Sequence, residues 1–164
     1  MDKTAVVYYS LDGHTHLVAT KISERLDCPA IRLRLQKEFS NANTFPKYFR
    51  AGKSSVFRDK PALVTSNLDL EAYDTFVIAT PVWAGNLSSP VRSFLSSHSF
   101  DGKQVFLVAT NNGGSFKRCF ATMRKLLPTA SVAGEICFVK ITEENYPSHR
   151  RRLEEFCENI LAKQ

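Results

Sequence analysis

TAVVYYSLDGHTHLVATKISERL, residues 4–26, joins a short apolar run to a segment with helical periodicity. Its first six residues are almost all apolar, β-branched or aromatic, which is typical of a strand buried on both faces. Val18, Ile22 and Leu26 then recur every four residues, as on the buried side of a helix. Between the two lies SLDGHT, residues 10–15, with hydroxyls, a carboxylate, a glycine and an imidazole. The stretch therefore predicts a strand, a polar turn and a helix.

The same alternation of strand-like and helix-like segments continues to the end of the chain. Apolar runs at residues 75–80, 104–110 and 135–141 match buried parallel strands, whereas residues 30–35 alternate between apolar side chains and arginines, as in a strand nearer the sheet edge. Three further helical stripes are formed by Leu87, Val91, Phe94 and Leu95, by Phe116, Cys119, Phe120, Met123, Leu126 and Leu127, and by Leu153, Phe156, Cys157, Ile160 and Leu161. This order predicts an α/β fold, a doubly wound five-stranded parallel sheet with helices on both faces.

Length and composition predict one soluble domain over residues 1–164, with 43% hydrophobic and 23% charged residues. No apolar run approaches the roughly 18 residues of a membrane span, and the first residues lack the regions of a signal peptide. We therefore expect a cytoplasmic protein without a membrane span. Its four cysteines show no C-x-x-C pairing, so reduced and mostly buried thiols are expected.

One long segment, residues 40–67, interrupts the alternation with irregular sequence that contains two prolines and four aromatic residues. A loop of this length is usually functional or disordered, and its aromatic content is too high for an idle linker. We expect this insertion to pack over another part of the molecule.

Three loops are candidates for a binding site, because ligands of open α/β sheets bind beyond the carboxyl ends of the strands. In the first loop, the hydroxyls of Ser10 and Thr15, the tight turn at Gly13 and the start of a helix suit an anion such as phosphate. The alternative is an ordinary helix N-terminus in which Ser10 or Asp12 is the N-cap.

The second and third loops fall on the same rim of the predicted sheet. Residues 80–86 contain Trp83, the single tryptophan, which suits either a packing lid or a stacking platform. Residues 110–115 offer two glycines and two amides that suit the edge of a flat heteroaromatic ring. An ordinary strand-to-helix turn is the alternative for this third loop.

These loops resemble those of the flavodoxin family. SLDGHT resembles its FMN phosphate loop, usually Ser/Thr, any residue, Ser/Thr, Gly, any residue, Thr, and residues 68–95, with the sequence Pro-Val-Trp-Ala-Gly, resemble the third strand, flavin loop and following helix. The likeness spans essentially the whole chain, including the insertion. It implies one non-covalent FMN and the strand order 2-1-3-4-5, for which flavodoxin is the standard example.

The resemblance also implies which residues bind the cofactor. The phosphate would be held by Ser10, Leu11, Asp12, Gly13, His14 and Thr15, and the ring would lie between Pro81, Val82, Trp83, Ala84 and Gly85 on one side and Asn111, Asn112, Gly113 and Gly114 on the other. Asp12 departs from the family pattern because it stands where a hydroxyl residue is usual, and His14 replaces the common Asn. A carboxylate near a phosphate of about −1.5 to −2 charge bears on FMN affinity, unless Asp12 points away and caps the helix.

The chemistry implied is that of the flavin, which carries out one- and two-electron steps while the protein orients it. We find no catalytic acid, base or nucleophile constellation, no metal-ligand cluster and no G-x-G-x-x-G fingerprint for a resident nicotinamide. The expected function is electron transfer or flavin-dependent oxidoreduction, with a quinone as one candidate acceptor. The sequence leaves open whether the protein is a carrier or an enzyme linked to NAD(P)H or quinones. The alternative is a flavodoxin-fold binding module that has lost FMN and serves a protein partner.

Charge distinguishes the chain from the acidic shuttle that the resemblance suggests, because its net charge is +6. Residues 31–66 carry eight Lys/Arg against two acids and residues 102–134 carry five against none, so the rest of the chain is acidic. Both basic segments adjoin the predicted site. A solvated basic face explains them, and the alternative is an acidic redox partner or an anionic substrate that is steered to the flavin. No nucleic-acid motif accompanies the charge, so we expect no nucleic-acid partner.

Overall fold

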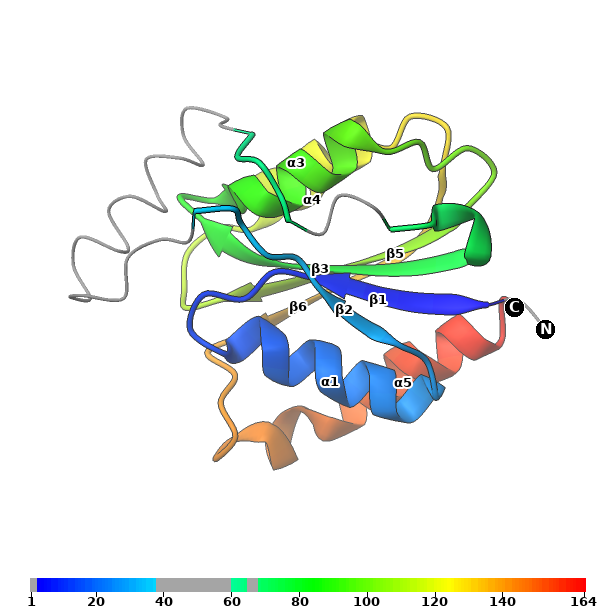
Figure 1. Ribbon diagram of the computed structural model, residues 1–164. Helices are drawn as coiled ribbons and strands as arrows, with labels where there is room; N and C mark the ends of the chain where they lie inside the picture. Colours follow the sequence, from blue (N-terminus) through cyan, green and yellow to red (C-terminus); the bar gives the residue numbers. More distant parts are fainter. Residues whose placement is uncertain (1–2, 38–59, 65–67) are drawn as a thin grey trace.

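The apolar runs form a central parallel sheet in the computed structural model, which describes residues 3–37, 60–64 and 68–164 (Figure 1). Its parallel strands are β1 (Thr4–Tyr8), β2 (Ala30–Arg32), β3 (Thr75–Trp83), β5 (Gln104–Asn111) and β6 (Ser131–Val139). They lie in the order β2-β1-β3-β5-β6, which is 2-1-3-4-5 when only these five are counted. A short sixth strand, β4 (Asn86–Leu87), pairs antiparallel with the end of β3. The predicted fold class is confirmed.

Helices cover both faces of the sheet (Figure 1). On one face lie α1 (His14–Leu26) and α5 (Tyr146–Leu161), which contact each other. The opposite face carries α3 (Ser89–Ser97) and α4 (Lys117–Lys125), and a short 3-10 turn, η1 (Leu70–Ala72), precedes β3. Because these strands run parallel, their carboxyl ends lie at the same edge of the sheet. The loops after β1, β3 and β5 therefore meet at that edge.

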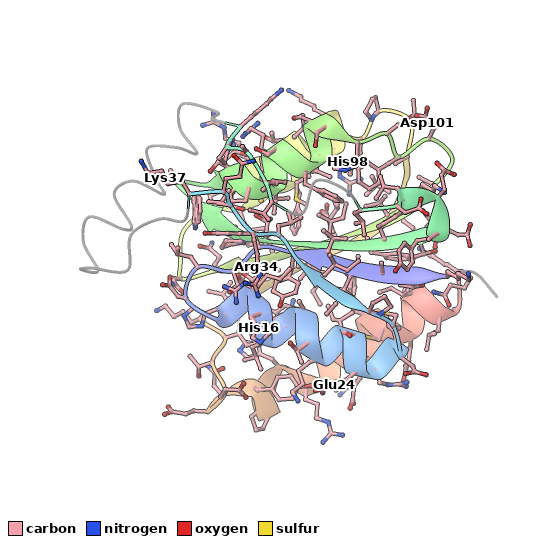
Figure 2. All side chains as sticks on the ribbon, in the orientation of Figure 1. His16, Glu24, Arg34, Lys37, His98 and Asp101 are labelled. Atoms are coloured by element: carbon pink, nitrogen blue, oxygen red, sulfur yellow. The ribbon has the colours of Figure 1, made fainter. Side chains whose placement is uncertain are left out.

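The edge strand β2 is shorter than predicted, because the ladder ends at Arg32 rather than at residue 35. The chain nevertheless stays beside the sheet: the Leu33 N–H donates to the Tyr8 carbonyl (2.7 Å), and Leu35 forms an isolated antiparallel bridge with Leu63. The predicted alternation is confirmed, since Leu33 and Leu35 are buried while the arginines beside them are exposed. Figure 2 shows Arg34 on this outer flank of the molecule.

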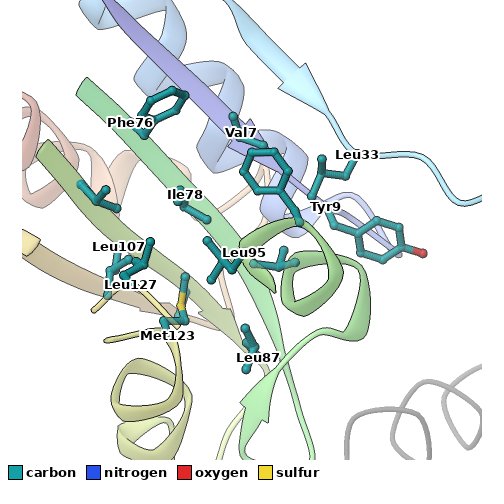
Figure 3. Packing of buried hydrophobic residues seen from close by; sticks show 14 of the residues in the cluster. Val7, Tyr9, Leu33, Phe76, Ile78, Leu87, Leu95, Leu107, Met123 and Leu127 are labelled. Atoms are coloured by element: carbon teal, nitrogen blue, oxygen red, sulfur yellow. The ribbon is translucent and has the colours of Figure 1, made fainter. Parts of the chain in front are cut away.

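Two hydrophobic clusters fill the spaces between the sheet and its helices. Neighbouring residues of β1 enter different clusters, with Val7 packed on the α3 and α4 side and Val6 on the α1 and α5 side. Figure 3 shows the first cluster, in which Ile78 and Leu107 of the sheet face Met123 of α4. A strand buried on both faces has to be apolar at every position, which explains the continuous apolar runs of the sequence.

The bounds of β6 differ most from the prediction of 135–141. The strand begins at Ser131. The residues from there to Gly134 form no continuous apolar run, but they pair with the start of β5. A register shift occurs at Val105/Phe106, opposite Gly134. A Cβ at Gly134 would lie 3.1 Å from the Phe106 ring, so a side chain at this position would require the ring to shift.

Three smaller predictions also need comment. Leu87 belongs to β4 rather than to the helix, which begins at Ser89 with Pro90 in its first turn. Leu161 lies at the end of α5 and is 43% exposed, so it is not part of the buried stripe. Most of the 40–67 insertion lies outside the described residues; of its described part, Leu63 is buried and the Pro61 carbonyl accepts the Ser93 hydroxyl (2.7 Å).

The four cysteines are free, as expected, and Cys119, Cys137 and Cys157 are buried. Burial raises the pKa of Cys28 and Cys137 to about 11 and of Cys119 and Cys157 to about 12. Such thiols stay protonated at neutral pH and are therefore poor nucleophiles. Within the described residues, no helix combines the length and hydrophobicity required to span a bilayer.

Candidate functional site

A cavity of about 220 Å³ opens at the carboxyl ends of β1, β3 and β5, where the three predicted loops meet. Its walls consist of Ser10, Leu11, Asp12, His14 and Thr15 from the first loop, Pro81, Val82 and Trp83 from the second, and Thr110, Asn111, Asn112 and Gly113 from the third. Thr110 was not among the predicted site residues, although it opens the third loop. Four predicted residues do not line the cavity, namely Gly13, Ala84, Gly85 and Gly114, and each has a positive φ. These four shape the turns that carry the lining residues.

The N-terminus of α1 is built around Gly13, which is the N-cap with φ 97°. A residue with a side chain would be strained in this conformation, which explains the glycine. The Gly13 N–H donates to the Ser10 hydroxyl (3.1 Å), and the Gly13 carbonyl accepts the first helical bond from Leu17 (2.9 Å). The first-turn N–H groups of His14, Thr15 and His16 therefore have no intrahelical acceptor.

The N-cap residue is Gly13, which has no side chain to cap this helix end. The alternative in which Ser10 or Asp12 is the N-cap is therefore wrong: Ser10 instead holds the turn that precedes the cap. Asp12 is exposed and lines the cavity. The N-terminus of a 13-residue helix with glycine as its N-cap, facing a cavity, is a favourable position for an anion.

A pair of buried threonines joins the first loop to the third. The hydroxyls of Thr15 and Thr110 lie 2.7 Å apart, and both side chains are almost fully buried. A hydroxyl pair uses only one of its two protons for the mutual hydrogen bond. The other O–H remains able to donate to a ligand at the helix N-terminus.

The outer side of the first loop is supported from the edge strand. Arg32 donates from its guanidinium to the Ser10 carbonyl (3.0 Å), which fixes the first peptide of the loop. Next to it, the Tyr8 hydroxyl is hydrogen-bonded to Nδ1 of His16 (2.6 Å). Burial raises the pKa of Tyr8, while the positive charges of Arg32 and Arg34 lower it by a smaller amount.

The second loop is a two-residue hairpin between β3 and β4, which sequence reasoning missed. Trp83 pairs with Asn86, and the turn residues Ala84 and Gly85 have φ values of 48° and 75°. Two consecutive positive φ values are typical of a type I′ turn, whose Gly in second place was the available sequence signal. The hairpin base is fixed by Thr80, whose hydroxyl accepts the Ser88 N–H (3.0 Å).

Trp83 is only 7% exposed, because most of its indole packs into the hydrophobic core. Its ring meets that of Tyr9 edge-on, with centroids 5.7 Å apart and an interplanar angle of 88°. The remaining surface of the indole contributes to the cavity wall. Trp83 therefore has a packing role, and its stacking on a ligand stays a prediction.

In the third loop the Asn111 amide, one of the two predicted for a heteroaromatic edge, forms hydrogen bonds within its own loop. Its Nδ2 donates to the Gly114 carbonyl (3.0 Å) and its Oδ1 accepts the Gly113 N–H (3.2 Å). The side chain thus closes its own loop. Asn112 is exposed and lines the cavity, so its amide is better placed for a ligand.

Comparison with known proteins identifies the family of this fold and site. A family model described as flavodoxin matches residues 3–151. The chain belongs to the flavodoxin family. A solved flavoprotein from Lactobacillus acidophilus, in complex with FMN, covers 90% of this chain and 98% of its own with a TM-score of 0.69 and 20% identity. At this identity the likeness shows the shared flavodoxin fold.

Two curated relatives of this flavodoxin family member are each described as an NAD(P)H dehydrogenase (quinone). The protein from Gluconacetobacter diazotrophicus is 28% identical over 95 residues, which are 57% of this chain and 45% of the relative. That from Cupriavidus metallidurans is 28% identical over 138 residues, which are 77% of this chain and 67% of the relative. The chain thus spans about half to two thirds of the length of these relatives.

Proposed function

We propose that this flavodoxin family member binds one FMN in the cavity and transfers electrons through it. The observation that carries the proposal is the N-terminus of α1, with Gly13 as its N-cap, which opens into a cavity formed by the loops after β1, β3 and β5. This is the place where open α/β sheets bind their ligands, and the family implies FMN as the ligand.

The groups around the helix N-terminus suit a phosphate. The N–H groups of His14, Thr15 and His16 would be its donors, together with the spare O–H of the Thr15–Thr110 pair. Hydrogen bonds to a charged acceptor are about twice as strong as neutral ones, so several donors compensate for the loss of solvation. Arg32 would keep the Ser10 end of the loop in place through its bond to the backbone.

The walls beyond the phosphate position suit a flat ring. Val82 and Trp83 offer apolar surface on one side, and Asn112 and Gly113 offer polar and backbone groups on the other. When bound, FMN supplies the one- and two-electron chemistry, while the protein holds and orients the ring. The intact cavity speaks against the alternative of a binding module that has lost FMN.

The finer function that we propose is electron exchange between a donor and an acceptor such as a quinone. The relatives described as NAD(P)H dehydrogenase (quinone) support a nicotinamide-linked donor and a quinone acceptor. Because the chain spans only part of these relatives, its own activity can be either that of a carrier or that of an oxidoreductase.

Two experiments test the proposal, one for FMN binding and one for the type of activity. Purified protein should be yellow or take up FMN at a ratio of one per chain in a spectrophotometric titration. Failure to bind FMN would overturn the proposal. Steady-state assays with NADH or NADPH and a quinone then separate the two activities: turnover indicates an oxidoreductase, whereas flavin reduction only in the presence of a separate reductase indicates a carrier.

A further inference from the structure

Of the 18 Lys and Arg residues that the structure describes, eleven form two groups that differ in their surroundings. One group consists of cations held in ion pairs within 4.0 Å, namely Lys21, Arg25, Lys103, Arg124, Arg150 and Arg151, whose partners are glutamates. None of these six lines the cavity. Their charges are locally balanced, so they contribute little to the field at the site.

The second group lies at the carboxyl edge of the sheet, around the cavity, and we name it the edge cations: Arg32, Lys37, Lys117, Arg118 and Lys140. Arg32 ends β2 and binds the Ser10 carbonyl, and Lys37 follows a few residues later, as Figure 2 shows at the same end of the molecule. Lys117 and Arg118 begin α4 directly after the third loop. All five are exposed, and none forms an ion pair within the part of the chain that the structure describes.

Lys140 is tied to the site by its backbone. It follows β6 with φ 52°, and its N–H donates to the Asn111 carbonyl at 2.7 Å. The same edge carries the carboxylates of Asp12, Glu143 and Glu144, which are fewer than the cations. Among these described groups the cations outnumber the carboxylates by five to three, so this edge of the sheet carries a net positive charge.

The spread of the edge cations indicates the size of the partner. They reach from β2 to β6, the two outer strands of the parallel order, so they span four strand spacings, about 19 Å. A single small anion would contact only a fraction of this width, whereas a protein interface covers about 800 Å² on each partner. The cations come from separate elements next to the cavity, at the end of β2, the start of α4 and the end of β6, which fits a globular partner better than a nucleic-acid backbone.

We infer that an acidic redox protein docks on the edge cations, over the mouth of the cavity. The inference rests on the proposed function and adds the chemistry of its partner. Complementary charge steers the encounter and raises the association rate, most strongly at low ionic strength. One electron at a time then passes between the flavin and the redox centre of the docked protein.

Stopped-flow mixing tests this inference with two proteins of opposite charge. The FMN-loaded protein is reduced with dithionite and mixed with the ferric soluble domain of cytochrome b5, which is acidic, or with ferric cytochrome c, which is basic. Each fully reduced flavin gives up two electrons, releases its protons to solvent and reduces two ferric haems. The second-order rate with cytochrome b5 should fall about tenfold or more between low and physiological ionic strength, and that with cytochrome c should rise or stay constant.

A matched pair of variants separates local from net charge. Lys117→Gln/Arg118→Gln/Lys140→Gln should lower the cytochrome b5 rate at low salt by about tenfold, while Arg25→Gln/Lys125→Gln/Arg151→Gln, with the same loss of charge elsewhere, should change it little. Equal losses in both variants, a rate that rises with salt, or tight binding of a labelled DNA duplex at physiological salt would overturn the inference. FMN titration of each variant keeps the two proposals apart, because absence of flavin binding contradicts the proposed function instead.

Discussion

Asp12 contributes a carboxylate to a cavity whose other polar groups favour an anion. The sequence left two arrangements open, one in which the carboxylate faces the phosphate and one in which Asp12 points away and caps the helix. The structure shows Gly13 as the N-cap, with no side-chain cap. Asp12 is thus exposed at the mouth of the predicted phosphate site, where it should oppose FMN binding.

Asp12→Thr should therefore tighten FMN binding. At about 6 Å and an effective dielectric near 20 the repulsion is roughly 3 kcal/mol per unit of phosphate charge, and exposure reduces it several-fold, so we expect about a fivefold gain at low ionic strength. The gain should shrink as salt is added, and riboflavin, which has no phosphate, should bind equally well to both forms. Unchanged FMN affinity at low and high salt would show that the carboxylate does not face the phosphate.

Arg32 is the residue that links the edge strand to the phosphate loop, through its 3.0 Å bond to the Ser10 carbonyl. Arg32→Gln should weaken FMN binding about three- to tenfold, since it removes a charged donor and a nearby positive charge. Riboflavin binding should change less. Arg25→Gln is the matched control, because Arg25 lies at the opposite end of α1 in an exposed ion pair with Glu158. Equal effects of both variants would contradict a local role.

At the scale of elements, the β3–β4 hairpin determines where Trp83 can act. The pairing of Trp83 with Asn86 and the type I′ turn hold the indole between the core and the cavity. The sequence placed Trp83 at the mouth of β3 but predicted the strand to end at residue 80. It missed the hairpin because a two-residue strand has no periodicity to detect.

The single tryptophan offers a direct optical probe of the cavity. FMN binding should quench Trp83 fluorescence, and Trp83→Phe should weaken FMN binding by less than Trp83→Ala, for which about 1 to 3 kcal/mol is expected from lost stacking. Since Trp83 is nearly buried, Trp83→Ala should also lower the free energy of unfolding by about 3 to 5 kcal/mol. Affinity that is unchanged in both variants would leave Trp83 with a packing role alone.

Much of the element order could be predicted because buried parallel strands have continuous apolar sequences. The limits of β6 could not, because residues 131–134, Ser-Val-Ala-Gly, form no continuous run of large apolar residues and join the sheet through backbone pairing with β5. Similarly, the three loops were predicted as one site because their strands end at the same edge. The use of the Asn111 amide inside its own loop depends on backbone geometry that composition does not reveal.

Because its thiols are buried, the whole molecule should become less stable as the pH rises into the alkaline range. Burial raises the pKa of Cys119 and Cys157 to about 12 from an ordinary value of 9.0, so the folded state keeps protons that the unfolded chain loses above about pH 9. The free energy of unfolding should be unaffected by these groups below pH 9 and fall above it, by up to about 1.4 kcal/mol per pH unit and thiol.

Urea midpoints measured under reducing conditions at pH 8 and pH 10 test this dependence. The decrease in the urea midpoint from pH 8 to pH 10 should be smaller in Cys119→Ala than in the unchanged protein. Each protein is compared with its own midpoint at pH 8, because Cys119→Ala starts from a lower stability. A midpoint that does not change with pH would contradict the assignment of buried, protonated thiols.

The central claim for the whole molecule is that the N-terminus of α1 binds the phosphate of FMN. Titration of the flavin-free protein with FMN and with riboflavin, in the same buffer, tests it most directly, because the two ligands share the ring and differ by the phosphate. We predict that FMN binds about 100-fold more tightly, or roughly 2.7 kcal/mol, as expected for several hydrogen bonds to a charged group. Equal dissociation constants for FMN and riboflavin would contradict the claim.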